Sequence, residues 1–173
     1  MNLYFRLLWL LFSPLVPAQL NSITRTKFRC WPADLDLNLH MNNGRFLTLM
    51  DLGRLDFMRC SGLLWPCLKR RWLPVLGATQ MTFLRPIKLW QTFVIESEIE
   101  YWDDKWIVMR QRFTDNGRLL AVGRIRGIFR GPQGNVAPAR LLELIGHSGD
   151  PPPLPAEVAS WLATLDSQQN RSA

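Results

Sequence analysis

The stretch DLDLNLHMNNGRF, from Asp34 to Phe46, determines how the rest of this 173-residue chain is interpreted. It places two aspartates, one of the chain's two histidines and three asparagines directly before a long apolar run. Apolar residues then recur at helical spacing from Leu47 to Met58, interrupted by only three charged residues. This pattern predicts a long, largely buried helix.

Both ends of this helix carry residues that usually bound helices. Asn42 or Asn43 is suited to cap the first turn, and Ser61-Gly62 is suited to end the last one. A carboxylate and an imidazole therefore lie on a loop that leads into a helix N-terminus. Free backbone N–H groups at such an end can polarise a carbonyl oxygen or stabilise an oxyanion, which is what acyl transfer requires.

The run DLDLNLHMNN resembles the motif of the 4-hydroxybenzoyl-CoA thioesterase branch of the hotdog-fold superfamily, and within it the thioesterase-superfamily-member-six-like proteins. The Trp102-Asp103-Asp104 turn and the segment PPPLPAEVASW, from Pro151 to Trp161, extend the resemblance over about Ile23 to Trp161. It implies an α+β hotdog fold, in which a curved antiparallel sheet wraps around one long central helix, with short helices at both termini.

The rest of the chain alternates between strand-length apolar runs and turn signals. Strands are predicted over 23–30, 72–87, 92–102, 106–114 and 118–130. Gly123 and Gly127 in the last strand are expected to leave room for the helix. The order of strand, loop, helix and four strands agrees with a sheet that curves around a single helix.

Alternation within the strands separates an apolar face from a charged face. We expect the residues that meet the helix from strand 92–102 to be Phe93, Ile95, Ser97, Ile99 and Tyr101. The glutamates between them lie on the outer face. If residues 103–105 form a three-residue turn, Glu98 lies opposite Arg110 and Glu96 lies opposite Arg112, and each pair contributes roughly 0.2–1 kcal/mol.

Composition fits one globular domain, with 47% hydrophobic and 20% charged residues. We expect an N-terminal apolar segment over 1–20, a hotdog domain over 21–147, and a proline-rich linker with a C-terminal helix and tail over 148–173. Three cysteines without a CxxC pair indicate neither a disulfide framework nor a metal site. Reduced thiols in a cytoplasmic protein are therefore expected.

The N-terminal segment contains an apolar run of at most ten residues, Leu7 to Val16, whereas a spanning helix needs about 20. Three interpretations stay open. The segment is a short helix that packs on the fold or on a neighbouring subunit, an interfacial membrane contact, or a cleaved signal peptide.

The net charge of +7 suggests an anionic partner. The chain has no recognised nucleic-acid motif, and several arginines have glutamates as expected strand neighbours, so nucleic-acid binding is not expected. A small polyanion fits better. Four cations are predicted to bind the phosphates of coenzyme A: Arg70, Arg71, Arg85 and Lys88. The alternative is that these residues form only a solvated basic surface.

The resemblance assigns the catalytic carboxylate to Asp36, four residues before His40, and not to Asp34. Asp36 would act as nucleophile or as general base on water, with an Asx-turn as its structural alternative. His40 would contact the thioester, transfer a proton or only shape the loop. The predicted oxyanion and substrate-binding residues are Asn42, Asn43 and Gly44, with helix capping as the alternative for the two asparagines.

Two features distinguish this chain from other hotdog enzymes. Many hotdog thioesterases have glycine directly before the histidine, whereas this chain has Leu39. A different hotdog arrangement pairs a helix glutamate with a threonine one turn later. The helix predicted here contains no glutamate, so that arrangement is excluded.

Apolar side chains of the helix and of segment 77–84 are predicted to form the acyl pocket: Phe46, Met50, Phe57, Met81 and Phe83. The alternative is that these side chains only fill the core. The resemblance implies an acyl-CoA thioesterase that releases a carboxylic acid and free coenzyme A and needs no cofactor beyond that part of its substrate. A catalytically weak acyl- or lipid-binding protein and an acyl-carrier-protein thioesterase are the alternatives. Because a single sheet leaves edges exposed, we expect a homodimer or a dimer of dimers.

Overall fold

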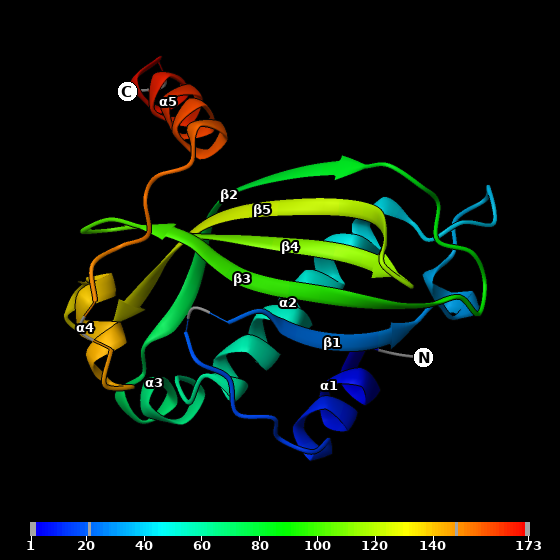
Figure 1. Cartoon of the computed structure of the whole chain (residues 1–173), viewed down its shortest axis with the longest axis horizontal. Helices are drawn as coiled ribbons and strands as arrows, with labels where there is room; N and C mark the ends of the chain where they lie inside the picture. The colour runs from blue at the N-terminus through cyan, green and yellow to red at the C-terminus, as the bar shows by residue number, and fades with distance from the viewer. Residues whose placement is uncertain (1–2, 21, 148, 172–173) are drawn as a thin grey trace.

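The computed structural model describes residues 3–20, 22–147 and 149–171 of the chain, so the outermost residues of both predicted terminal segments lie outside the described part. An antiparallel sheet curves around one long helix, α2 (Asn43–Cys60), as Figure 1 shows. Asn42 caps the start of α2 and Ser61 its end, at the predicted positions. The α+β hotdog prediction is confirmed.

The sheet contains every predicted strand, with boundaries close to those expected. These are β1 (Thr24–Arg29), β2 (Leu73–Phe83), β3 (Thr92–Trp102), β4 (Ile107–Asp115) and β5 (Arg118–Gly131). They pair antiparallel in the order β1-β3-β4-β5-β2, and a short β6 (Gly134–Val136) extends beside β5. β1 and β2 are therefore the long edges of the described sheet, and the motif loop follows directly from one of them.

Five further helical segments surround this unit: α1 (Leu3–Phe12), η1 (Pro32–Asp34), α3 (Leu64–Arg70), α4 (Pro138–Glu143) and α5 (Ala156–Arg171). α1 and α5 are the predicted terminal helices, although α5 has 16 residues and is longer than expected. α3 and α4 were not predicted, because seven and six residues are too few to show a helical period. Within the described residues, no helix is both long and apolar enough to cross a bilayer.

The two glycines predicted to face the helix have different surroundings. A Cβ atom added to Gly123 would lie 2.4 Å from Cε of Met50 on α2, so a side chain at this position would force the Met50 side chain to move. A Cβ atom on Gly127 would instead meet the carbonyl oxygen of Val75 on β2 at 3.2 Å. The prediction is therefore confirmed at Gly123 and wrong at Gly127.

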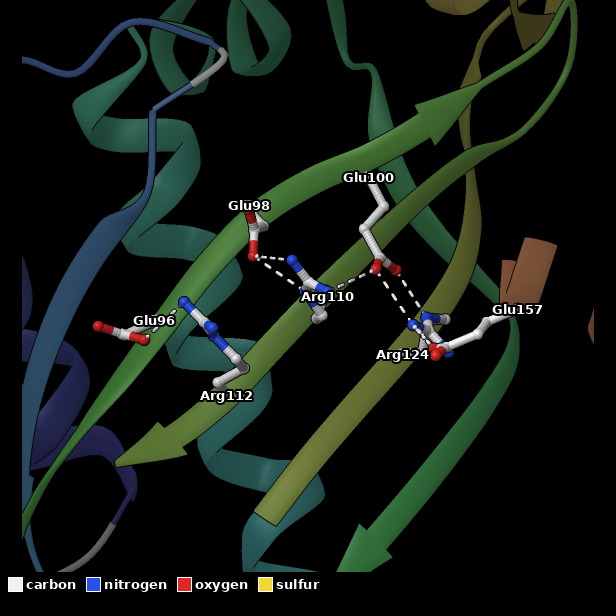
Figure 2. Close-up of polar contacts among 7 residues, drawn as sticks. All are labelled: Glu96, Glu98, Glu100, Arg110, Arg112, Arg124 and Glu157. Atoms are coloured by element: carbon white, nitrogen blue, oxygen red, sulfur yellow. Dashed lines mark hydrogen bonds and ion pairs between the residues drawn. The ribbon is translucent and has the colours of Figure 1, made fainter. Parts of the chain in front are cut away.

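The predicted ion pairs on the outer face of the sheet are present, but for a different reason than expected. Glu98 lies opposite Arg110 and Glu96 opposite Arg112, at N–O distances of 2.9 Å and 3.1 Å (Figure 2). The turn between β3 and β4 has four residues, 103–106, and not three. A β-bulge at Glu100 offsets the extra turn residue and restores the register.

The same bulge reverses the side chains beyond it. Tyr101 lies opposite Val108, whereas Trp102 enters the hydrophobic core, so the prediction that Tyr101 faces the helix is wrong. The bulged Glu100 accepts hydrogen bonds from Arg124 at 2.6 Å and 3.1 Å, and Arg124 also contacts Glu157 of α5 at 3.1 Å (Figure 2). The outer-face arginines therefore neutralise glutamates and attach α5 to the sheet.

Candidate active site

The motif loop is a tight turn whose two ends are hydrogen bonded. The Asp36 N–H donates to the His40 carbonyl oxygen at 2.9 Å, and the Leu39 N–H donates to the Asp36 carbonyl oxygen at 3.1 Å. The loop is fastened to the segment before β3, since the Met41 N–H donates to Ile87 at 2.9 Å. The backbone thus holds Asp36 and His40 side by side at the base of the turn.

The Asp36 carboxylate is half-buried and has one oxygen engaged. Its Oδ1 accepts the Asn38 N–H at 2.9 Å, which is the Asx-turn that the sequence allowed as an alternative. Its Oδ2 has no hydrogen-bond partner among the described residues. The turn and a chemical role are therefore compatible, because one oxygen sets the orientation of the carboxylate and the other has no hydrogen-bond partner among the described residues.

Among the predicted oxyanion residues, the N-terminus of α2 offers the backbone N–H of Asn43 but not that of Gly44. Asn42 Oδ1 accepts the Gly44 N–H at 2.8 Å, and the Asn42 carbonyl oxygen accepts the Arg45 N–H at 2.8 Å. The Gly44 N–H is therefore occupied by the cap. The Asn43 N–H has no acceptor within the part of the chain that the structure describes. It is the N–H group available to a carbonyl oxygen.

Three other potential nucleophiles, Asp34 in the loop and two thiols elsewhere in the fold, are less suitable. Asp34 is buried in an ion pair with Arg6 and does not face solvent. Burial raises the pKa of the Cys30 thiol to about 11, and the nearby negative charge of Asp34 adds to this effect. Burial also raises the pKa of the Cys67 thiol to about 11. Neither thiol is ionised at neutral pH, which leaves the Asp36 carboxylate as the accessible candidate.

The four predicted phosphate-binding cations lie in two separate places within the chain. Lys88 pairs with His40 in an isolated β-bridge, and Arg85 lies on the same segment beside the motif loop. Arg70 and Arg71 lie at the end of α3, which follows the opposite end of α2 (Figure 1). α2, which lies between the motif loop and α3, has 18 residues and is about 27 Å long. Only Arg85 and Lys88 are near the loop.

A cavity of about 400 Å³ lies between the second half of α2 and the sheet. Asp51 and Arg54 are the only charged residues in its wall, and they form an ion pair with each other. The rest of the wall is apolar apart from backbone atoms and comes from α2, the strands and the segments around them: Leu52, Leu55, Phe57, Met58, Leu63, Pro74, Val75, Leu76, Ile99, Ile107, Met109, Ile125, Gly127, Ile128, Phe129 and Leu141.

This cavity was not predicted, and only one of the five predicted pocket residues, Phe57, lines it. The other four pack elsewhere. The rings of Phe46 and Phe83 lie 5.0 Å apart, and Met50 and Met81 meet beside the bare backbone of Gly123. Within this group Phe46 and Met50 are buried, whereas Phe83 is 44% exposed.

The sequence model of the thioesterase-like superfamily matches residues 30–162, which include the motif loop, α2 and the whole of β2 to β5. The chain belongs to this superfamily. α1 lies outside the matched region.

One related protein and two solved structures are similar to this chain. Protein THEM6 of Drosophila melanogaster is 29% identical over 141 residues, covering 79% of this chain and 70% of that protein. The structure of BH1999 gentisyl-coenzyme A thioesterase matches with a TM-score of 0.62 at 15% identity, over 70% of this chain and 98% of that one. Staphylococcus aureus SAV2348, solved in complex with CoA, matches with a TM-score of 0.65 at 14% identity, over 74% and 84%. At these identities the two structures demonstrate a shared fold.

Leu39, directly before His40, has a left-handed backbone conformation. Its φ angle is 59°, in the left-handed region where a side chain costs about 1–2 kcal/mol and glycine costs little. The Leu39 side chain is 72% exposed, so it gains little from burial within this chain. The loop therefore carries backbone strain next to the candidate carboxylate.

We predict that Leu39→Gly raises the free energy of unfolding by about 0.5–1 kcal/mol, because the relief of strain exceeds the entropy that glycine adds to the unfolded chain. Leu37→Gly is the matched control, since Leu37 is fully exposed in the same loop and has no positive φ angle. Urea unfolding measures both. Equal destabilisation by the two substitutions would show that the Leu39 backbone is not strained.

Proposed function

We propose that this thioesterase-superfamily protein hydrolyses an acyl-CoA thioester to a carboxylic acid and free coenzyme A. One observation carries the proposal. A half-buried carboxylate, that of Asp36, and a backbone N–H group without an acceptor, that of Asn43, lie at the two ends of one short loop. The fold shared with a gentisyl-coenzyme A thioesterase and with a protein solved in complex with CoA supports coenzyme A as the carrier of the acyl group.

In the proposed reaction the thioester carbonyl oxygen accepts the Asn43 N–H, which stabilises the negative charge that develops there. The free Oδ2 of Asp36 either takes a proton from water, so that hydroxide adds to the carbonyl carbon, or adds to that carbon itself. The tetrahedral intermediate then collapses, the C–S bond breaks, and the thiolate of coenzyme A leaves. In the second route water hydrolyses the resulting acyl-aspartyl anhydride. His40, beside Asp36 in the turn, contacts the substrate near the thioester.

We predict that Asp36→Asn lowers kcat by at least about 100-fold without unfolding the protein. The amide oxygen of asparagine still accepts the Asn38 N–H, so the Asx-turn survives while the ionised oxygen is lost. Release of free thiol from a panel of acyl-CoA esters, aliphatic and aromatic, measures the effect. Asp104→Asn, at an exposed position in the turn between β3 and β4, is the control and keeps full activity.

Three results would contradict the proposal. An Asp36→Asn enzyme with unchanged kcat would remove Asp36 from the chemistry. A wild-type protein that binds acyl-CoA without hydrolysing it would be an acyl-binding protein, and one that hydrolyses only acyl groups on a carrier protein would be an acyl-carrier-protein thioesterase.

We propose that two copies of the chain pair through β2. This edge strand is exposed along almost its whole length, and it leaves apolar side chains uncovered: Leu73, Val75, Leu76 and Phe83. Long apolar edge strands are normally covered, and a two-fold axis lets one edge pair with its copy. Light scattering at micromolar concentration should give a dimer or a dimer of dimers, and Val75→Lys should weaken it. An active monomer would contradict the proposal.

We further propose that the acyl chain lies in the 400 Å³ cavity, with Phe57 in its wall. Asp51, the wall residue of α2 nearest the helix N-terminus, lies eight residues beyond Asn43, or about 12 Å along α2, so an acyl chain that reaches the cavity must be long. Phe46, Met50 and Met81 belong to the core in this proposal, and the exposed Phe83 packs against Phe46 at the core's margin.

We predict that Leu55→Trp, which fills the cavity from α2, shifts the preference toward short acyl-CoA substrates by at least about tenfold in kcat/KM. Met81→Trp changes the other group of side chains and is expected to leave the preference unchanged. Both ratios come from hydrolysis of an acyl-CoA series by folded variants. The opposite outcome, with a shift in Met81→Trp alone, would return the acyl site to that group.

Contact with a membrane surface through the N-terminal segment stays a prediction. α1 exposes apolar and aromatic side chains over most of its surface: Tyr4, Phe5, Leu8, Trp9, Leu11 and Phe12. A bilayer surface or a neighbouring subunit would cover such a face. Co-sedimentation with phosphatidylserine vesicles distinguishes the two, because a helix covered by another subunit does not bind vesicles.

A further inference from the structure

α1 has an inverted pattern of burial. Its only charged residue, Arg6, is buried, together with Leu10, while most of its apolar side chains face solvent. Helices on a protein surface normally bury their apolar side and expose their charges. A guanidinium group is expensive to bury unless it finds a charged partner and hydrogen bonds. The position of α1 therefore depends on what Arg6 meets.

Arg6 meets the first aspartate of the motif run. Its Nη2 bonds to Oδ2 of Asp34, and the two side chains are only 4% and 1% exposed. The same nitrogen donates to the carbonyl oxygen of Arg29 at the end of β1, at 3.1 Å. Asp34 Oδ2 also accepts the Trp31 N–H at 2.8 Å. One buried ion pair thus joins α1, the end of β1 and the start of the motif loop.

Asp34 in turn fixes the far end of the same loop. Its carbonyl oxygen accepts the Asn42 N–H at 2.8 Å, and Asn42 caps α2 directly before the free Asn43 N–H. Asp36 lies two residues after Asp34. The hydrogen bond between Asn42 and Asp34 therefore closes the loop that contains Asp36, and Asn43 follows directly after this loop.

A second cation is present but is poorly placed to substitute for Arg6. The Nε atom of Arg45 lies 3.7 Å from Oδ1 of Asp34, and that oxygen is buried without a hydrogen-bond partner. Without Arg6, the buried negative charge of Asp34 would turn toward Arg45 or draw in water. Either movement displaces the segment that holds Asp36 and Asn42.

We propose that Arg6 is a positioning residue for thioester hydrolysis, which acts through its buried ion pair with Asp34 to hold Asp36 and Asn43 in place. This inference rests on the proposed function. It assigns a role in the reaction to a helix outside the region shared with the superfamily model, residues 30–162. Because a displacement of about 1 Å can cost about 100-fold in rate, loss of the pair is expected to act on kcat.

The test compares three variants of the full chain: Arg6→Gln, Arg6→Lys and Leu10→Ala. Leu10 is 1% exposed and anchors α1 by apolar contact alone, so Leu10→Ala loosens the helix and keeps the ion pair. kcat and KM are measured with the acyl-CoA that wild type hydrolyses best, at a temperature where circular dichroism shows every variant folded. We expect Arg6→Gln to lose at least about tenfold in kcat with a smaller change in KM, and Arg6→Lys to recover part of the loss. Leu10→Ala keeps the wild-type kcat.

Unchanged kcat in folded Arg6→Gln, or an equal loss in Leu10→Ala, would overturn the proposal. If Arg6→Gln does not fold, the double variant Arg6→Gln with Asp34→Asn removes both buried charges. A folded double variant with low kcat supports the role of the pair, and one with wild-type kcat refutes it.

Amide NMR spectra separate this inference from the proposed function. Arg6→Gln should shift the Asp36 and Asn43 resonances, and Leu10→Ala should leave them in place. If wild type hydrolyses no thioester, the proposed function fails and Arg6 has no reaction to assist, yet the spectra still show whether it holds the loop. Unshifted resonances in Arg6→Gln overturn the inference even in an active enzyme.

Discussion

The structure depends on the close approach of α2 to the inner face of the sheet. Side chains are missing on both sides of this contact, at Gly53 on the helix and Gly123 on β5. A Cβ atom on Gly53 would lie 2.8 Å from Nε2 of Gln111, and one on Gly123 would lie 2.4 Å from Met50. Gln111 is fully buried and donates to the Met50 carbonyl oxygen at 3.0 Å and to Ser97 Oγ at 2.9 Å. This combination of close packing and satisfied polar groups fixes how α2 is placed, and with it the position of its N-terminus.

Local patterns predicted the elements well because they are set by neighbouring residues. The range of β3, 92–102, was predicted to the residue, since alternation and the flanking turn signals both lie within a few positions. The bulge at Glu100 was not predicted. It arises because Glu100 reaches Arg124, 24 residues away, while Trp102 turns into the core. The position of the bulge therefore depends on contacts with distant segments of the chain, which the spacing of residues along one strand does not reveal.

The candidate site shows the same division. Asp36, His40 and Asn43 lie within eight residues of one another in the sequence, so the motif alone predicts that they are close in space. The occupied N–H of Gly44 depends on which asparagine caps the helix, and the sequence left both open. Arg70 and Arg71 were grouped with Lys88 by charge alone, although the length of α2 separates them. The Arg6–Asp34 pair and the 400 Å³ cavity join distant segments and leave no local signal.

A crystal structure of the protein with a ketone analogue of acyl-CoA, in which a methylene group replaces the sulfur, tests the account most directly. Such an analogue keeps the carbonyl group and cannot be hydrolysed at that bond. If Asp36 and the Asn43 N–H form the active site, the carbonyl oxygen of the analogue lies about 2.7–3.1 Å from the Asn43 nitrogen. Oδ2 of Asp36 then faces the carbonyl carbon directly or through one water. A carbonyl group bound away from the N-terminus of α2, with the Asn43 N–H pointing into solvent, would contradict it.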